Sequence, residues 1–220
     1  KTTLIFVVSV IALSILIRIE YLPNIYGIHY FVDDRSIYDI KYIFHVITSI
    51  PYTLVGIIGI YVVFLNRNNK DVFYHNYETI IWYVFYSTLF ITTYGSIYYH
   101  LSPSNERLIW EHIPRVIMLS CVFAYIIFNA TTSKASIFIL PITIGIGMVV
   151  IWLWHNNLIS GTSNMLPYFI FQVLLITISI MIFKLFTQFY SGKKYVIWII
   201  VWYLLAALFK WFDSVLFFIF

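Results

Sequence analysis

Long apolar segments dominate this sequence and leave few folds open to it. A membrane-spanning helix needs about 20 largely apolar residues, and seven segments come near this length. They run near 3–19, 42–65, 78–101, 114–130, 136–154, 165–190 and 195–219. The connections are short except for the loop 20–41. The pattern predicts an all-α, polytopic membrane helix bundle of about seven helices, which forms a single transmembrane domain over residues 1–220.

The composition agrees with an integral membrane protein. Hydrophobic residues make up 62% of the chain and charged residues only 10%, whereas soluble domains carry about 25% charged residues. The formal net charge is +4, but the basic residues are scattered. We therefore expect no nucleic-acid partner and assign the excess to loops that meet anionic lipid headgroups. A single cysteine, Cys121, excludes an internal disulfide, and its apolar surroundings predict an inert thiol.

The first apolar segment allows two interpretations. Lys1 and the apolar run 4–17 resemble a signal peptide or a signal anchor, but no Ala-x-Ala cleavage site precedes Glu20. We therefore expect a retained first helix. Because the first residue is Lys rather than Met, we also expect the chain to be a processed or partial product.

The stretch 95–114 concentrates polar groups where the third segment ends and the fourth begins. Ser96 and His100 are four residues apart and share one face of a helix. Glu111 follows after what reads as a short polar turn, and Pro114 as the first turn of the next helix. Because such groups are costly near lipid and are usually kept there for function, we predict a polar site at this end of the bundle.

Each of these groups also has an ordinary structural interpretation. A lone histidine or serine at a helix end can simply bond to a helix carbonyl, and Glu111 with Arg107 can form a solvated i,i+4 pair. Together they match the needs of a zinc hydrolase, which uses imidazole ligands, an acid/base carboxylate and an oxyanion donor. His45 is a secondary candidate, whereas His112 is expected to point elsewhere.

An acidic group precedes the second segment. Asp33, Asp34 and Asp39 could bind a hard cation such as calcium through their carboxylates. An ordinary solvated loop, with Arg35 as the neutralising partner, is the alternative.

The residues quoted so far resemble the signature of the alkaline ceramidase family, most closely its bacterial-type members. The specific match is Gly95-Ser96-Ile97-Tyr98-Tyr99-His100-Leu101 followed by Trp110-Glu111-His112-Ile113-Pro114. The family reads similarly around Gly-Ser-x-Tyr-Tyr-His-Leu and Trp-Asp-Arg-Leu-Pro. Less specific matches lie at Phe31-Val32-Asp33-Asp34-Arg35, Val46-Ile47-Thr48-Ser49-Ile50-Pro51-Tyr52 and Ala206-Ala207-Leu208-Phe209-Lys210-Trp211-Phe212-Asp213. The resemblance covers about residues 31–220, in the family's order.

The resemblance implies a zinc amidase that cleaves the N-acyl amide of ceramide. The family belongs to a superfamily of seven-helix membrane hydrolases that also includes the progestin and adipoQ receptors. By this resemblance His100 is a zinc ligand, and Ser96 positions the substrate or stabilises the oxyanion. Glu111 takes the place of the family's aspartate, the acid/base on the zinc-bound water. Asp33 and Asp34 fall in the segment that binds calcium in some members.

The chain departs from the family in ways that bear on these roles. Glu111 is one methylene longer than aspartate, and Tyr42 and His45 stand where related sequences often have asparagine, which weakens the calcium expectation. The family's other two zinc ligands form a His-x-x-x-His on a final core helix, a motif this sequence lacks. The resemblance therefore gives one extra N-terminal helix plus six of a seven-helix core, and we expect the domain to be incomplete at its C-terminus.

Three functions stay open on the sequence. The first is a membrane amidase that hydrolyses ceramide-like lipids with zinc-activated water. The second is a non-catalytic lipid-binding or receptor-like member of the same superfamily without a complete zinc site. The third is an unrelated transporter or structural protein, for which charges at mid-depth would be expected. The bacterial-type motif favours a bacterial inner membrane, with the endoplasmic reticulum or Golgi membrane as the alternative. The acyl-chain preference and the oligomeric state stay open.

Overall fold

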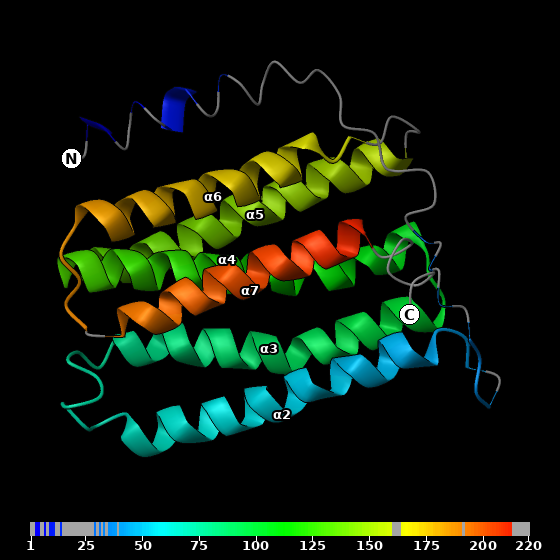
Figure 1. Cartoon of the computed structure of the whole chain (residues 1–220), viewed down its shortest axis with the longest axis horizontal. Coiled ribbons are helices and arrows are strands. Elements are labelled where there is room, and N and C mark those ends of the chain that lie inside the picture. Colours follow the sequence, from blue (N-terminus) through cyan, green and yellow to red (C-terminus); the bar gives the residue numbers. More distant parts are fainter. Residues whose placement is uncertain are drawn as a thin grey trace.

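A computed structural model describes residues 3–4, 7, 9–11, 14, 29, 31, 33, 35–38, 40–159, 164–190 and 192–212. Six long helices account for most of them (Figure 1). They are α2 (Ile43–Asn66), α3 (Glu78–Leu101), α4 (Asn105–Thr131), α5 (Ala135–Ile159), α6 (Leu166–Leu185) and α7 (Lys193–Trp211). The first predicted segment is described only at isolated residues, which are helical. The prediction of an all-α helix bundle is confirmed.

Five of the helices, α2 to α6, are long and apolar enough to cross a membrane. The sixth, α7, has a shorter apolar stretch over 194–206. Large apolar side chains on the outside of the bundle stay exposed, for example Ile58 and Leu65 of α2 and Phe138 of α5. A soluble protein rarely leaves so much apolar surface in contact with water. The chain is therefore an integral membrane protein.

The fourth helix begins earlier than the sequence analysis predicted. α4 starts at Asn105 instead of near residue 114, because the side chain of Ser104 accepts a hydrogen bond from the backbone N–H of Arg107 and caps the helix. Pro114 is consequently buried inside α4 and does not lie in its first turn. Glu111 lies on a helix and not after a turn, which changes its neighbours.

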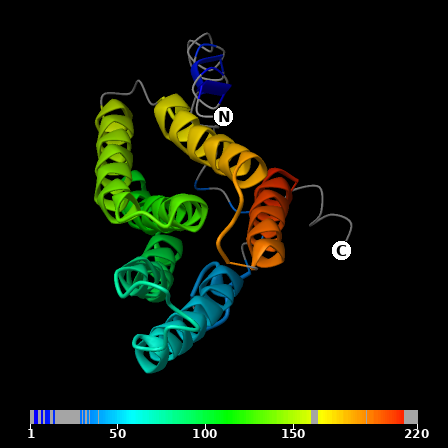
Figure 2. The same cartoon turned by 90° about the vertical axis from the view of Figure 1, so that its left-hand side faces the viewer.

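The helices pack as neighbours in a curved row, with α4 in contact with α3, α5 and α6. Close approaches depend on residues without a Cβ atom: at Gly56 of α2, a Cβ atom would come within 2.7 Å of the backbone nitrogen of Phe90 in α3. By contrast, α7 lies across an open interval from α4 in the end-on view (Figure 2). Over the described residues, none of its Cα atoms comes within 8 Å of a Cα atom in another helix.

Candidate functional site

The candidate site begins with two matching pairs of side chains on α2 and α3. His45 and Ser49 are four residues apart on α2, and Ser96 and His100 are four apart on α3 in the reverse order. Because the two helices run antiparallel, like residues meet. The hydroxyl oxygens of Ser49 and Ser96 are 2.8 Å apart, and the rings of His45 and His100 stack at 4.8 Å with an interplanar angle of 15°.

α4 supplies a carboxylate and a guanidinium to the same place. Arg115 donates to an Oε1 of Glu111 over 2.6 Å, and its other terminal nitrogen donates to Nδ1 of His112 over 3.1 Å. The sequence had suggested Arg107 as the partner of Glu111. Instead, Arg107 donates to the carbonyl of Tyr98 over 3.2 Å. Glu111 pairs with Arg115 because α4 continues through this region, and Arg115 lies on the next turn of the helix.

The side chain of His112 points away from the site, as expected. It nevertheless contributes to the site, because it holds Arg115 in place. Its ring packs against Trp154 of α5 at 5.1 Å and against Tyr168 of α6 at 4.7 Å, and it is 2% exposed. A ring fixed on two sides holds its Nδ1 in one position. His112 therefore orients Arg115, which in turn orients Glu111.

A backbone contact sets the distance between α3 and α4 at this level. Pro114 has no N–H for the carbonyl of Trp110, four residues before it. This carbonyl faces Gly95, where a Cβ atom would overlap it. The contact places Ser96, the next residue of α3, close to the turn of α4 that carries Glu111.

These side chains surround a cavity of about 290 Å³. Its lining comes from α2 (His45, Thr48, Ser49 and Tyr52), α3 (Thr92, Ser96 and His100) and α4 (Glu111, Arg115 and Met118). The three residues that the sequence singled out, Ser96, His100 and Glu111, thus lie around one space. All but Met118 of the lining side chains carry a polar atom, which is unusual inside a membrane bundle and is typical of a site that binds a polar group.

Two residues before α2 cover the loop end of the site. The ring of Phe31 lies 4.8 Å from each of the rings of His45 and His100. Nε2 of His29 is 2.6 Å from Oδ1 of Asn105, and Nδ1 is 3.0 Å from the hydroxyl of Tyr99. Since the amide oxygen can only accept, Nε2 donates to Asn105, and in the neutral imidazole Nδ1 then accepts from the Tyr99 hydroxyl.

The donor set fits a zinc ion only in part. Zinc in a catalytic site takes three protein ligands, with nitrogen at about 2.0–2.1 Å. The lone pairs of an imidazole lie in the ring plane, so the nearly parallel rings of His45 and His100 direct theirs side by side and not toward one point. Within the described residues, no group of three or more His, Cys, Asp and Glu side chains could hold a metal. His100 can serve as one ligand, but these residues do not complete a zinc site.

The acidic loop offers little to a calcium ion. Both carboxylate oxygens of Asp33 accept from Arg35, over 2.7 Å from Nε and 2.5 Å from Nη2. This pairing lowers the pKa of the Asp33 carboxyl below its usual value. Asp34 and Asp39 lie outside the described residues. Asp33 would have to give up Arg35 to bind a cation, and the calcium expectation stays a prediction.

The sequence analysis missed Ser49, Arg115 and the supporting role of His112, and gave His45 only a secondary place. The sequence did contain a pattern that predicts the contact of His45 and Ser49 with α3. α2 carries His-x-x-x-Ser and α3 carries Ser-x-x-x-His. On antiparallel neighbouring helices these two patterns place like residues opposite each other. Arg115 was hidden by the late start predicted for α4.

No protein-family model matches this chain, and neither a curated protein nor a solved structure matches it.

Proposed function

We propose that this chain is a membrane hydrolase that cleaves the N-acyl amide of ceramide-like lipids in the cavity between α2, α3 and α4. One observation carries the proposal: Ser96, His100 and Glu111 line a single polar cavity within an apolar bundle. These are the residues to which the resemblance assigns the chemistry. The polar amide group of a lipid amide can bind in such a cavity, while its apolar chains contact the apolar helices around it.

The residues of the cavity can divide the work of amide hydrolysis. Glu111, oriented by Arg115, would take a proton from the attacking water and pass it to the leaving amine. Ser96, next to Ser49, would donate to the oxygen that becomes negatively charged. Arg115 also brings a positive charge to the same space. All of these side chains line the cavity.

Zinc enters this proposal through His100. When bound, zinc would lower the pKa of its water and polarise the amide carbonyl. Because the described residues do not complete its ligand set, we assign no step to the metal. Calcium at Asp33 and Asp34, and a bacterial inner membrane as the location rather than the endoplasmic reticulum or Golgi membrane, are further parts of the proposal that rest on the resemblance.

The geometry of the histidines favours a second candidate. Stacked imidazoles and an incomplete zinc ligand set suit a lipid-binding or receptor-like protein that holds a ceramide-like lipid without cleaving it. The two candidates share the cavity and differ in turnover.

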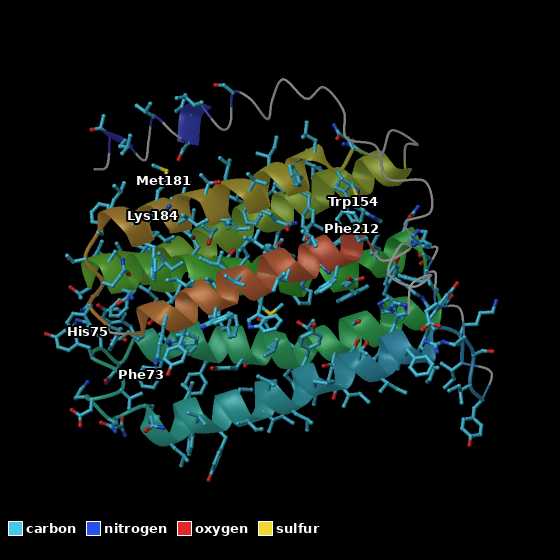
Figure 3. All side chains as sticks on the ribbon, viewed as in Figure 1. Phe73, His75, Trp154, Met181, Lys184 and Phe212 are labelled. Carbon is cyan, nitrogen blue, oxygen red and sulfur yellow. The ribbon has the colours of Figure 1, made fainter. Side chains whose placement is uncertain are left out.

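The deciding experiment measures ceramide hydrolysis and zinc content of the purified full-length protein in lipid nanodiscs. For the full-length protein we expect hydrolysis, about one bound zinc, and loss of both in His100→Ala with an unchanged melting temperature. His75→Ala is the matched control, because His75 lies at the other end of the bundle (Figure 3), and it should retain full activity. Hydrolysis by His100→Ala would exclude the zinc role. Ceramide binding with neither hydrolysis nor zinc in the unmutated full-length protein would establish the second candidate.

A further inference from the structure

Two apolar cavities follow one another from the polar one. The first, of about 220 Å³, shares Arg115 and Met118 with the polar cavity. The second, of about 230 Å³, shares Phe85, Val122 and Ile199 with the first. The polar cavity thus continues, through common walls, into apolar space between α3, α4 and α7.

One face of α4 runs along all three cavities. Glu111, Arg115, Met118, Val122 and Ile126 follow one another at steps of three or four residues and therefore share a face of the helix. The face changes from charged at Glu111 to wholly apolar beyond Met118. At 1.5 Å per residue, the distance from Glu111 to Ile126 is about 22 Å, a large part of the bilayer's hydrocarbon thickness.

The position of α7 keeps this apolar space from closing. Its backbone stays away from the other helices, and side chains bridge the interval. The hydroxyl of Tyr203 donates to Oε1 of Gln172 in α6 over 2.5 Å, and Val196 packs in a buried cluster with Ile126 and Phe183. A helix held at this distance leaves room for a narrow chain between its side chains.

We propose that the three cavities form one channel that binds the acyl chain of the lipid whose amide lies beside Glu111, and that Phe85, Val122 and Ile199 set the longest chain that fits. The identity of the amide rests on the proposed function, whereas the channel itself rests on the adjoining cavities. An acyl chain is the occupant because the channel begins at polar groups suited to an amide and becomes apolar at once. The three residues lie where the two apolar cavities meet, so a bulkier side chain there would shorten the channel.

The test uses the full chain in phosphatidylcholine nanodiscs and ceramides that carry a photoreactive diazirine at the far end of a short or a long acyl chain. After illumination, mass spectrometry locates the label. We expect the long-chain probe to label the channel segments of α4 or α7, within 116–126 or 195–203. Ile199→Trp should lower long-chain labelling by about tenfold for every two methylene groups excluded, and leave short-chain labelling unchanged.

Ile197→Trp is the matched control, since Ile197 is two residues away on the same helix and is similarly exposed, 47% against 43% for Ile199. It should behave as the unmutated chain. Val122→Phe, from the opposite wall, should repeat the effect of Ile199→Trp. Equal effects of Ile197→Trp and Ile199→Trp, or label on the lipid-facing side of α2, would each overturn the channel.

The labelling requires no turnover, so the two proposals can fail separately. Correct labelling without hydrolysis would keep the channel and remove the amidase. Ceramide hydrolysis together with label outside α4 and α7 would keep the amidase and remove the channel.

Discussion

The bundle holds a glutamate near each of its two ends, one buried and one partly exposed, and their surroundings differ. Glu78, at the start of α3, is 1% exposed. Its Oε2 accepts from the hydroxyl of Tyr190 over 2.5 Å, and its Oε1 accepts from the backbone N–H of His75. The Tyr190 hydroxyl also accepts from the N–H of Tyr74 over 2.9 Å, while the N–H of Tyr190 donates to Oδ1 of Asn129 over 2.7 Å.

Glu111, at the other end, has a cavity beside it. Its side chain is 16% exposed and that of Arg115 is 31% exposed. Arg115, which donates a hydrogen bond to Glu111, lies one turn along the same helix. The hydrogen-bond partners of Glu78 come instead from the loop before α3 and the connection after α6. Figure 3 shows this separation, with His75 near the left end of the bundle and Trp154, which packs on His112, toward the right.

The comparison shows that burial alone does not make a carboxylate functional. Glu78 joins segments that are far apart in the sequence, and burial together with this carboxylate raises the pKa of the Tyr190 hydroxyl. This arrangement fastens the end of the bundle. Glu111 pairs with Arg115 of its own helix, and it borders a space that a substrate could enter. We therefore expect Glu78 to govern stability and Glu111 to govern activity.

Replacement of the cavity glutamate should give the largest effect. Glu111→Gln keeps the size of the side chain but removes the base, so ceramide hydrolysis should fall by about 100-fold or more. The melting temperature should change little, because Arg115 keeps its hydrogen bond to His112 and the amide oxygen of the new side chain can still accept from Arg115. Glu111→Asp, which keeps a carboxylate, should retain most of the activity. Full activity in Glu111→Gln would end the distinction between the two glutamates.

Replacement of the other glutamate should reverse the pattern. Glu78→Gln loses charge-assisted hydrogen bonds at a buried position, which should lower the free energy of unfolding by about 2 kcal/mol. Tyr190→Phe removes one of these bonds and should cost about 1 kcal/mol. Equilibrium unfolding in detergent measures both, and hydrolysis per folded molecule should stay unchanged. A loss of activity at full stability would instead place Glu78 in the functional machinery.

Most of the helices, and the placing of Ser96 with His100 in the site, could be predicted from the sequence. Apolar length located α2 to α6, and i,i+4 spacing placed Ser96 with His100, because both signals are local. The wrong start of α4 came from reading a polar stretch as a turn, although Ser104 is a good cap. The hydrogen-bond network around Glu78 could not be predicted. Its members Tyr74, Asn129 and Tyr190 are far apart in the sequence and meet only after the whole bundle has formed.

The contact at Gly95 should give the smallest effect and tests what holds the cavity in shape. In Gly95→Ala the added methyl overlaps the Trp110 carbonyl and forces α3 and α4 apart, an overpacking that costs about 1–3 kcal/mol. The higher helix propensity of alanine offsets up to about 1 kcal/mol of this loss.

Because Ser96 and His100 would shift relative to Glu111, hydrolysis should also fall, by about tenfold. Gly145→Ala is the matched control: a Cβ atom at Gly145 meets nothing within 4 Å, so this variant should be as stable as the unmutated chain or more so, and fully active. Gly95→Ala and Gly145→Ala could instead show the same stability and the same rate of hydrolysis. In that case the close approach of α3 and α4 does not position the catalytic groups, and side-chain contacts alone would hold the cavity in shape.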